Sequence, residues 1–176
     1  MRKTFLTAFL AVLFASPAWS QTFRQADPNL TPRVTREVDL SGPRFGLTML
    51  GEGTIAKLSE RNIKVGSMIS QFGWQFEKRL YSGGDGVTAL MEWIPLVSGL
   101  EQGVALPSLN WLVGVRSSQG FEFGIGPNIT PVGVGLVIAG GVTVRTGALN
   151  VPLNFAVASS KSGPRVSIMT GFNLRR

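Results

Sequence analysis

The chain contains no cysteine and no histidine among its 176 residues. Without cysteine it forms no disulfide, so an exported form must be held together by its own core or by a membrane. Without either residue type it lacks the usual zinc ligands and the side chain that most often acts as a general base. These absences disfavour an enzyme. We expect no catalytic residue, no metal site and no cofactor.

Long apolar runs and clustered charge are also missing. No apolar run reaches the roughly 18 residues of a membrane-spanning helix. The longest candidate, 132–144, consists largely of valine and glycine, which favour a strand over a helix. Basic residues are scattered, with pairs such as Lys78-Arg79, whereas a nucleic-acid-binding surface shows a clustered stripe. We therefore expect no nucleic-acid partner.

Residues 1–20 have the organisation of a secretory signal peptide. Basic residues at positions 2–3 precede an apolar run over 5–15, which is too short to cross a bilayer as a helix. Ala18-Trp19-Ser20 then forms a small-x-small site, which predicts cleavage before Gln21. This segment holds two of the 17 basic residues and none of the 10 acidic ones, which leaves a formal charge of +5 on the remainder.

The chain changes character at residue 42. Residues 21–41 are polar and include Pro28 and Pro32, which predicts a linker or an N-terminal segment. Beyond them, apolar and polar residues alternate with the period of two that is typical of strands. A short helix is expected at 54–62. The predicted strands are 43–50, 68–81, 86–97, 108–117, 120–128, 132–145, 148–158 and 164–175.

The number and spacing of the strands predict the fold. The connectors SGGDG, SSQG and TGA have the composition of short hairpin turns and fall on alternate links between strands. An even number of strands joined in this way predicts an all-β fold, an eight-stranded antiparallel up-and-down barrel over residues 42–176.

Each predicted strand has one apolar face and one polar face. The polar face carries glycine, asparagine and glutamine, and Lys78 is the only lysine in the predicted strands. The apolar side chains would over-fill the interior of a soluble barrel of this size, and the polar face would make an unusual water-exposed surface. The pattern favours a membrane barrel with its aromatic residues toward lipid. These residues are Phe72, Trp74, Phe76, Trp93, Trp111, Phe121, Phe123, Phe155 and Phe172.

The strand at 86–97 fits the alternation less well than the others. Leu90 and Ile94 share the parity of Glu92, so they are expected inside the barrel with it.

Charged residues on the polar face would then line the lumen. Counting residues outward from each hairpin turn places Arg116 opposite Glu122, and Glu77 near Glu92 and Arg79. Because a buried charge must be paired, we expect an arginine–glutamate network that fills the lumen. Its predicted members are Glu77, Arg79, Glu92, Arg116, Glu122, Arg145 and Arg165. The excess of arginine leaves a narrow, weakly anion-attracting pathway as an alternative.

The alternation, the signal peptide and the turn spacing resemble the small eight-stranded outer-membrane β-barrel proteins of Gram-negative bacteria. The segment VSIMTGFNLRR is similar to the C-terminal strand that those proteins present to the barrel-assembly machinery, although it ends in Arg175-Arg176 instead of an aromatic residue. The resemblance implies an outer-membrane location, contact with outer-membrane lipids, and short turns and termini on the periplasmic side. Lipid-modifying enzymes among such barrels use a histidine, which this chain lacks.

The sequence thus predicts a non-catalytic outer-membrane barrel with a plugged polar lumen and a structural or surface-interaction role. Two alternatives stay open. One is a periplasmic or secreted, lipocalin-like barrel that binds an apolar ligand inside. The other is a narrow channel or transporter for small solutes. Partner contacts are expected at the longer links, 51–67 and 98–107.

Overall fold

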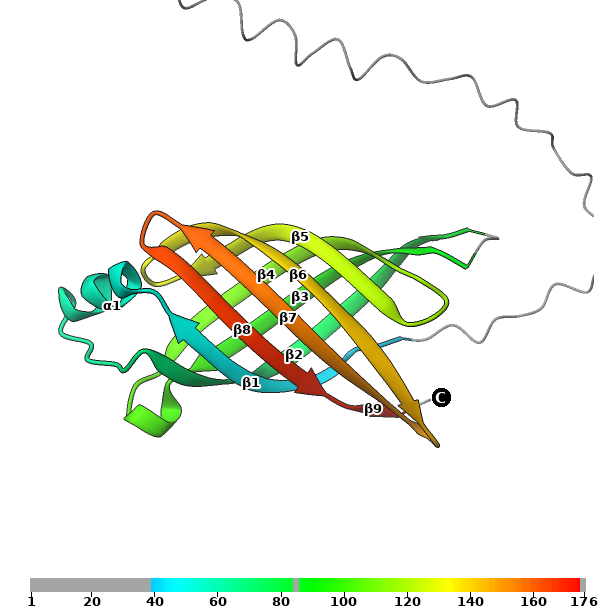
Figure 1. Cartoon of the computed structure of the whole chain (residues 1–176), viewed down its shortest axis with the longest axis horizontal. Coiled ribbons are helices and arrows are strands. Elements are labelled where there is room, and N and C mark those ends of the chain that lie inside the picture. The colour runs from blue at the N-terminus through cyan, green and yellow to red at the C-terminus, as the bar shows by residue number, and fades with distance from the viewer. Residues whose placement is uncertain (1–38, 84–85, 175–176) are drawn as a thin grey trace, which may run out of the picture. The chain divides into compact units, whose positions relative to one another are not determined.

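The β-strands close into a single antiparallel barrel in the computed structural model, which describes residues 39–83 and 86–174 (Figure 1). From β1 to β8 each strand pairs with the next, and β1 also pairs with β8. The predicted eight-stranded up-and-down barrel is confirmed, with one short extra strand. The elements are β1 Gly42–Leu50, α1 Glu52–Ser59, β2 Met68–Ser82, β3 Thr88–Ser98, the 3₁₀ turn η1 Leu100–Gln102, β4 Leu106–Arg116, β5 Phe121–Thr130, β6 Gly133–Thr146, β7 Leu149–Ser160, β8 Gly163–Gly171 and β9 Asn173–Leu174.

Three sequence-based predictions fall wholly or largely outside the described residues. They are the signal peptide at 1–20, most of the polar segment at 21–41, and the arginine pair at 175–176. The described part of the polar segment, 39–41, packs against the barrel. Leu40 is fully buried, and the side-chain amide of Asn173 donates a hydrogen bond to the carbonyl of Asp39. These residues therefore belong to the barrel.

The extra strand β9 continues β8 after a break. Leu153 pairs with Thr170 and Asn150 pairs with Asn173, so the interruption lies opposite Pro152 of β7. Proline has no N–H to donate to the ladder, which accounts for the missing rungs. The carbonyl of Pro152 instead accepts a hydrogen bond from the Thr170 hydroxyl at 2.9 Å.

The two ends of the barrel differ. The short connections after β2, β4 and β6 lie at one end, which we call the turn end, and α1 and η1 lie at the other, which we call the helix end (Figure 1). The helix predicted at 54–62 forms at Glu52–Ser59, so it begins two residues earlier and ends three residues earlier than predicted. It packs Leu58, which is 2% exposed, into an apolar cluster that includes Leu50 and Leu106. The helix therefore covers this end of the barrel.

Inward-facing glycines allow neighbouring strands to approach closely. A methyl group added at Gly126 would overlap the backbone carbonyl of Trp111, and one at Gly46 would overlap the carbonyl of Ile168. Glycine at such positions permits the tight bending that a small barrel requires. This explains why glycine recurs on the polar parity of the strands.

Candidate functional site

The outer wall of the barrel is apolar. Of the aromatic residues predicted on this face, Trp93 is half-buried between its register neighbours Phe76 and Trp111. The others are exposed, from 46% for Trp74 to 60% for Phe72. These exposed aromatics are Phe72, Trp74, Phe76, Trp111, Phe121, Phe123, Phe155 and Phe172. Aliphatic side chains such as Ile138 fill the positions between them.

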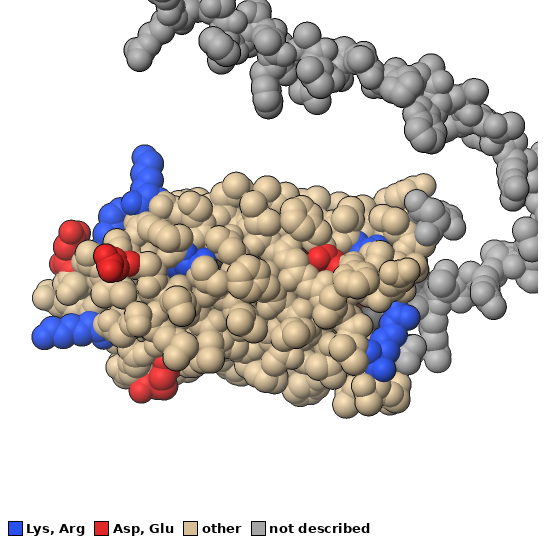
Figure 2. All heavy atoms as spheres, viewed as in Figure 1, with Lys and Arg blue, Asp and Glu red and all other residues tan. Residues whose placement is uncertain are grey.

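Charge is confined almost entirely to the ends of this wall. At the outward positions of the described strands Lys78 is the one charged residue, and it lies close to the turn end. In Figure 2 the charged atoms gather mainly at the two ends, and the wall between them is uncharged apart from a few small spots. An 11-residue strand such as β4, tilted by about 45°, spans about 25 Å, the height of the apolar band of a membrane barrel.

Arg116 is the centre of a charge cluster inside the turn end. Its guanidinium makes a two-pronged ion pair with Glu77, and its Nε donates to Glu122 at 3.0 Å. An oxygen of Glu92 lies 4.0 Å from the same guanidinium. The four side chains are 2–12% exposed, so these charges are held away from water.

A second arginine joins this cluster through an amide. Arg44 is 1% exposed, and its Nε donates to Gln75 at 2.9 Å. Gln75 in turn donates to Glu92 at 2.7 Å. Another nitrogen of Arg44 donates to the carbonyl of Leu40 at 2.6 Å, so the segment at 39–41 helps to fill the turn end. Gln75 shares the parity of Glu77, which is the sequence signal that could have placed it in the network.

The structure brings together four of the seven residues of the predicted network. The strand register places Arg116 opposite Glu122 and Glu77 opposite Glu92, as the residue count from the hairpin turns predicts.

The other three residues of the predicted network are arginines that lie elsewhere. Arg79 is half-buried beside the connection between β2 and β3. Arg145 is exposed and contacts the carbonyl of Ser118 at 3.4 Å, so its inclusion in a buried network is wrong. Arg165 is buried but lies toward the helix end, where it donates to Asn128. Strand parity reports the face of a residue and not its height along the barrel.

An apolar layer separates the two ends of the interior. Leu90 and Ile94 are buried on the inward face, as predicted for the irregular third strand. The layer consists of Ile94, Leu96, Leu112, Val137, Ala158 and Met169. Two cavities lined by described interior residues have volumes of about 20 Å³ near Glu92 and about 40 Å³ beneath α1. Such volumes hold a few water molecules at most.

Three glutamates converge on Arg116, yet no group of three or more Asp, Glu, His or Cys residues within 39–83 and 86–174 is arranged to hold a metal ion. No helix in the same ranges is long and apolar enough to cross a membrane. Comparison with known proteins finds no match to this chain, whether among family models, curated proteins or solved structures.

Proposed function

We propose that the protein is an outer-membrane β-barrel with a plugged polar interior and a structural or surface-interaction role. The observation that carries the proposal is the distribution of side chains across the wall. Exposed aromatic and aliphatic residues face outward, and paired charges face inward. A soluble monomer rarely exposes a contiguous apolar patch of more than a few hundred Å². In a bilayer the same apolar wall would contact apolar lipid chains.

The closed sheet supports this placement. Hydrocarbon offers no hydrogen-bond partner, so a spanning sheet must leave no unpaired edge. The pairing of β1 with β8 meets that requirement. Buried charges inside also need partners, and the Arg116 cation is paired with the carboxylates of Glu77 and Glu122.

The small interior cavities favour a structural or surface role over ligand carriage or transport. A lipocalin-like carrier would hold its apolar ligand in an internal pocket, and pockets for small ligands usually measure about 300–1,000 Å³. The two interior cavities that the described residues line, of about 40 and 20 Å³, are far smaller. A channel would require a continuous polar path, whereas the layer around Leu112 and Val137 is apolar.

The helix end is the surface that we assign to partner contacts. With the short turns and residues 39–41 on the periplasmic side, α1 and η1 face the exterior of the cell. Glu101 of η1 is tied to β2, because the Ser70 hydroxyl and N–H donate to its carboxylate and hold its pKa below the ordinary value. The charged residues of the connections between strands at this end are Glu52, Lys57, Glu60, Arg61, Lys64, Glu101 and Lys161.

The proposal is tested by fractionation and gel mobility. The full chain is expressed in a Gram-negative host, outer membranes are washed with carbonate, and samples are run in SDS with and without boiling. We expect a membrane-retained band whose mobility changes on heating, because closed membrane barrels resist SDS until they are heated. Release into the soluble periplasmic fraction, together with identical mobility before and after boiling, would show that the proposal is wrong.

A further inference from the structure

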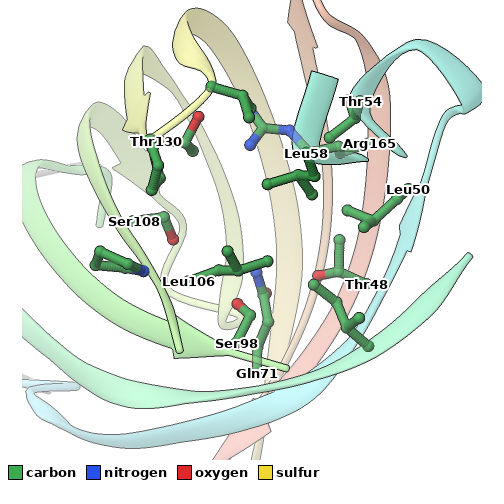
Figure 3. Close-up of a pocket in the computed structure, with 14 residues that line it drawn as sticks. Thr48, Leu50, Thr54, Leu58, Gln71, Ser98, Leu106, Ser108, Thr130 and Arg165 are labelled. Carbon is green, nitrogen blue, oxygen red and sulfur yellow. The ribbon is translucent and has the colours of Figure 1, made fainter. Parts of the chain in front are cut away.

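A small cavity lies inside the barrel directly beneath α1. Its volume is about 40 Å³, and its wall combines apolar side chains such as Leu58 and Leu106 with polar ones. Figure 3 shows Ser108 and Thr130 on one side of the central space, Thr48 across from them, and Arg165 close to Leu58 of the helix.

Arg165 is buried at this cavity without a carboxylate partner. It is 9% exposed, and one terminal nitrogen donates to the neutral side-chain oxygen of Asn128. Its Nε has no hydrogen-bond partner. Among the described residues, the ion pairs of the interior belong to Arg116, and none includes Arg165. A buried cation that lacks both a counter-ion and a full set of acceptors is costly unless an anion joins it.

Two further orphaned polar atoms line the same cavity. They are the hydroxyl oxygen of Ser108 and the amide oxygen of Gln71. Within the described residues six buried side-chain polar atoms lack a partner, and three of these belong to residues that line this one cavity. Buried polar groups are normally satisfied, so their concentration here indicates a missing occupant.

We propose that this cavity binds a small monocarboxylate of the size of formate or acetate. The single unpaired charge calls for a monovalent anion, and the planar guanidinium of Arg165 suits a planar carboxylate. The Ser108 hydroxyl supplies a further donor, whereas the Gln71 amide oxygen only accepts and does not contact the anion. At about 10–15 Å³ of this volume per water molecule, the cavity of about 40 Å³ holds about three to four non-hydrogen atoms. The apolar side chains of Leu58 and Leu106 accommodate a methyl group.

The anion enters from the helix end, because the apolar layer around Leu112 closes the interior on the other side. The site depends on the interior of the barrel and not on what surrounds its outer wall. The anion site therefore goes beyond the proposed membrane role, and a test of anion binding can fail while the membrane role holds, or the reverse.

The test is a titration of the folded full chain in detergent micelles with sodium acetate. Ionic strength is kept constant with sodium sulfate, whose divalent tetrahedral anion is too large for the cavity. The Nε–H resonance of Arg165 reports binding directly by NMR. We expect a saturable shift of that resonance, with a Kd on the order of 1 mM for so small a ligand. Heat-dependent gel mobility of the same sample reports the barrel fold independently.

Variants separate specific binding from general charge effects. Acetate affinity is then measured calorimetrically, since Arg165→Gln removes the reporting resonance. We expect Arg165→Gln to weaken acetate affinity at least tenfold and Ser108→Ala to weaken it severalfold. The control variant Arg145→Gln should leave acetate affinity unchanged, because Arg145 is exposed at the turn end. Ser108→Ala keeps the test decisive if Arg165→Gln does not fold.

Three results would overturn the inference. The first is the absence of saturation by about 100 mM acetate, which would mean that water alone occupies the cavity. The second is parental affinity in both Arg165→Gln and Ser108→Ala, which would place acetate elsewhere. The third is a saturable shift of the Arg165 resonance in a parallel titration with sodium chloride but not in the titration with acetate, which would replace the carboxylate with a halide.

Discussion

Arg116 and Arg165 show how differently one residue type can be buried in the same barrel. Arg116 has carboxylate partners on three neighbouring strands, β2, β3 and β5, so its charge is neutralised within the protein. Arg165 instead donates to the neutral side-chain amide of Asn128. The first arrangement stabilises the closed interior, whereas the second leaves a charge for an external group to complete.

Removing the cation of the turn-end cluster should destabilise the barrel strongly. Arg116→Leu leaves Glu77 and Glu122 buried without their principal partner, and breaking a buried ion pair from one side costs about 3–5 kcal/mol. Urea unfolding in lipid vesicles, followed by the heat-dependent gel band, would measure the loss. The matched variant Arg145→Leu alters an exposed arginine and should change the unfolding free energy by at most about 0.5 kcal/mol. Equal unfolding midpoints for the two variants would contradict a structural role for the cluster.

At the scale of a single strand, β5 offers two inward glycines with different surroundings. A methyl group at Gly126 would overlap the backbone carbonyl of Trp111, whereas one at Gly124 would make ordinary contacts, the nearest at 3.5 Å to Leu112. We expect Gly126→Ala to destabilise the barrel by more than about 2 kcal/mol, by forcing the backbone apart. Gly124→Ala should be close to neutral. The same urea assay distinguishes them, and similar stability of both variants would refute the close strand approach.

The alternation of residues predicts most of the elements but little of their assembly. Strand limits agree within about two residues except at the last strand, where the predicted 164–175 is interrupted opposite Pro152. Periodicity does not report the stagger between strands, and the stagger decides which inward residues share a layer. For that reason the alternation groups Arg165 with Arg116, although Arg165 lies near the other end of the barrel. The cavity beneath α1 depends on where the helix docks, which the alternation does not report.

At the scale of the whole molecule, the apolar wall predicts an effect that depends on depth. Ile138 lies at the middle of β6, and Val144 lies on the same face near the turn end. In a bilayer, Ile138→Arg should destabilise the barrel by about 2–4 kcal/mol and Val144→Arg by about 0–1 kcal/mol. Unfolding in vesicles compares the two variants. Two equally small losses would indicate that water, and not lipid, surrounds the wall.

The seam between β1 and β8 also imposes an order of events in time. It joins residues 44–50 to residues 165–171, whereas the other main ladders connect strands that are neighbours in the chain. Each local hairpin can form as soon as its two strands are present, but the seam must wait until nearly the whole described chain has been delivered. During that interval β1 and β8 both present open edges, on which two nascent copies can pair with each other. The rate of closure relative to the rate of encounter thus sets the yield of monomeric barrel.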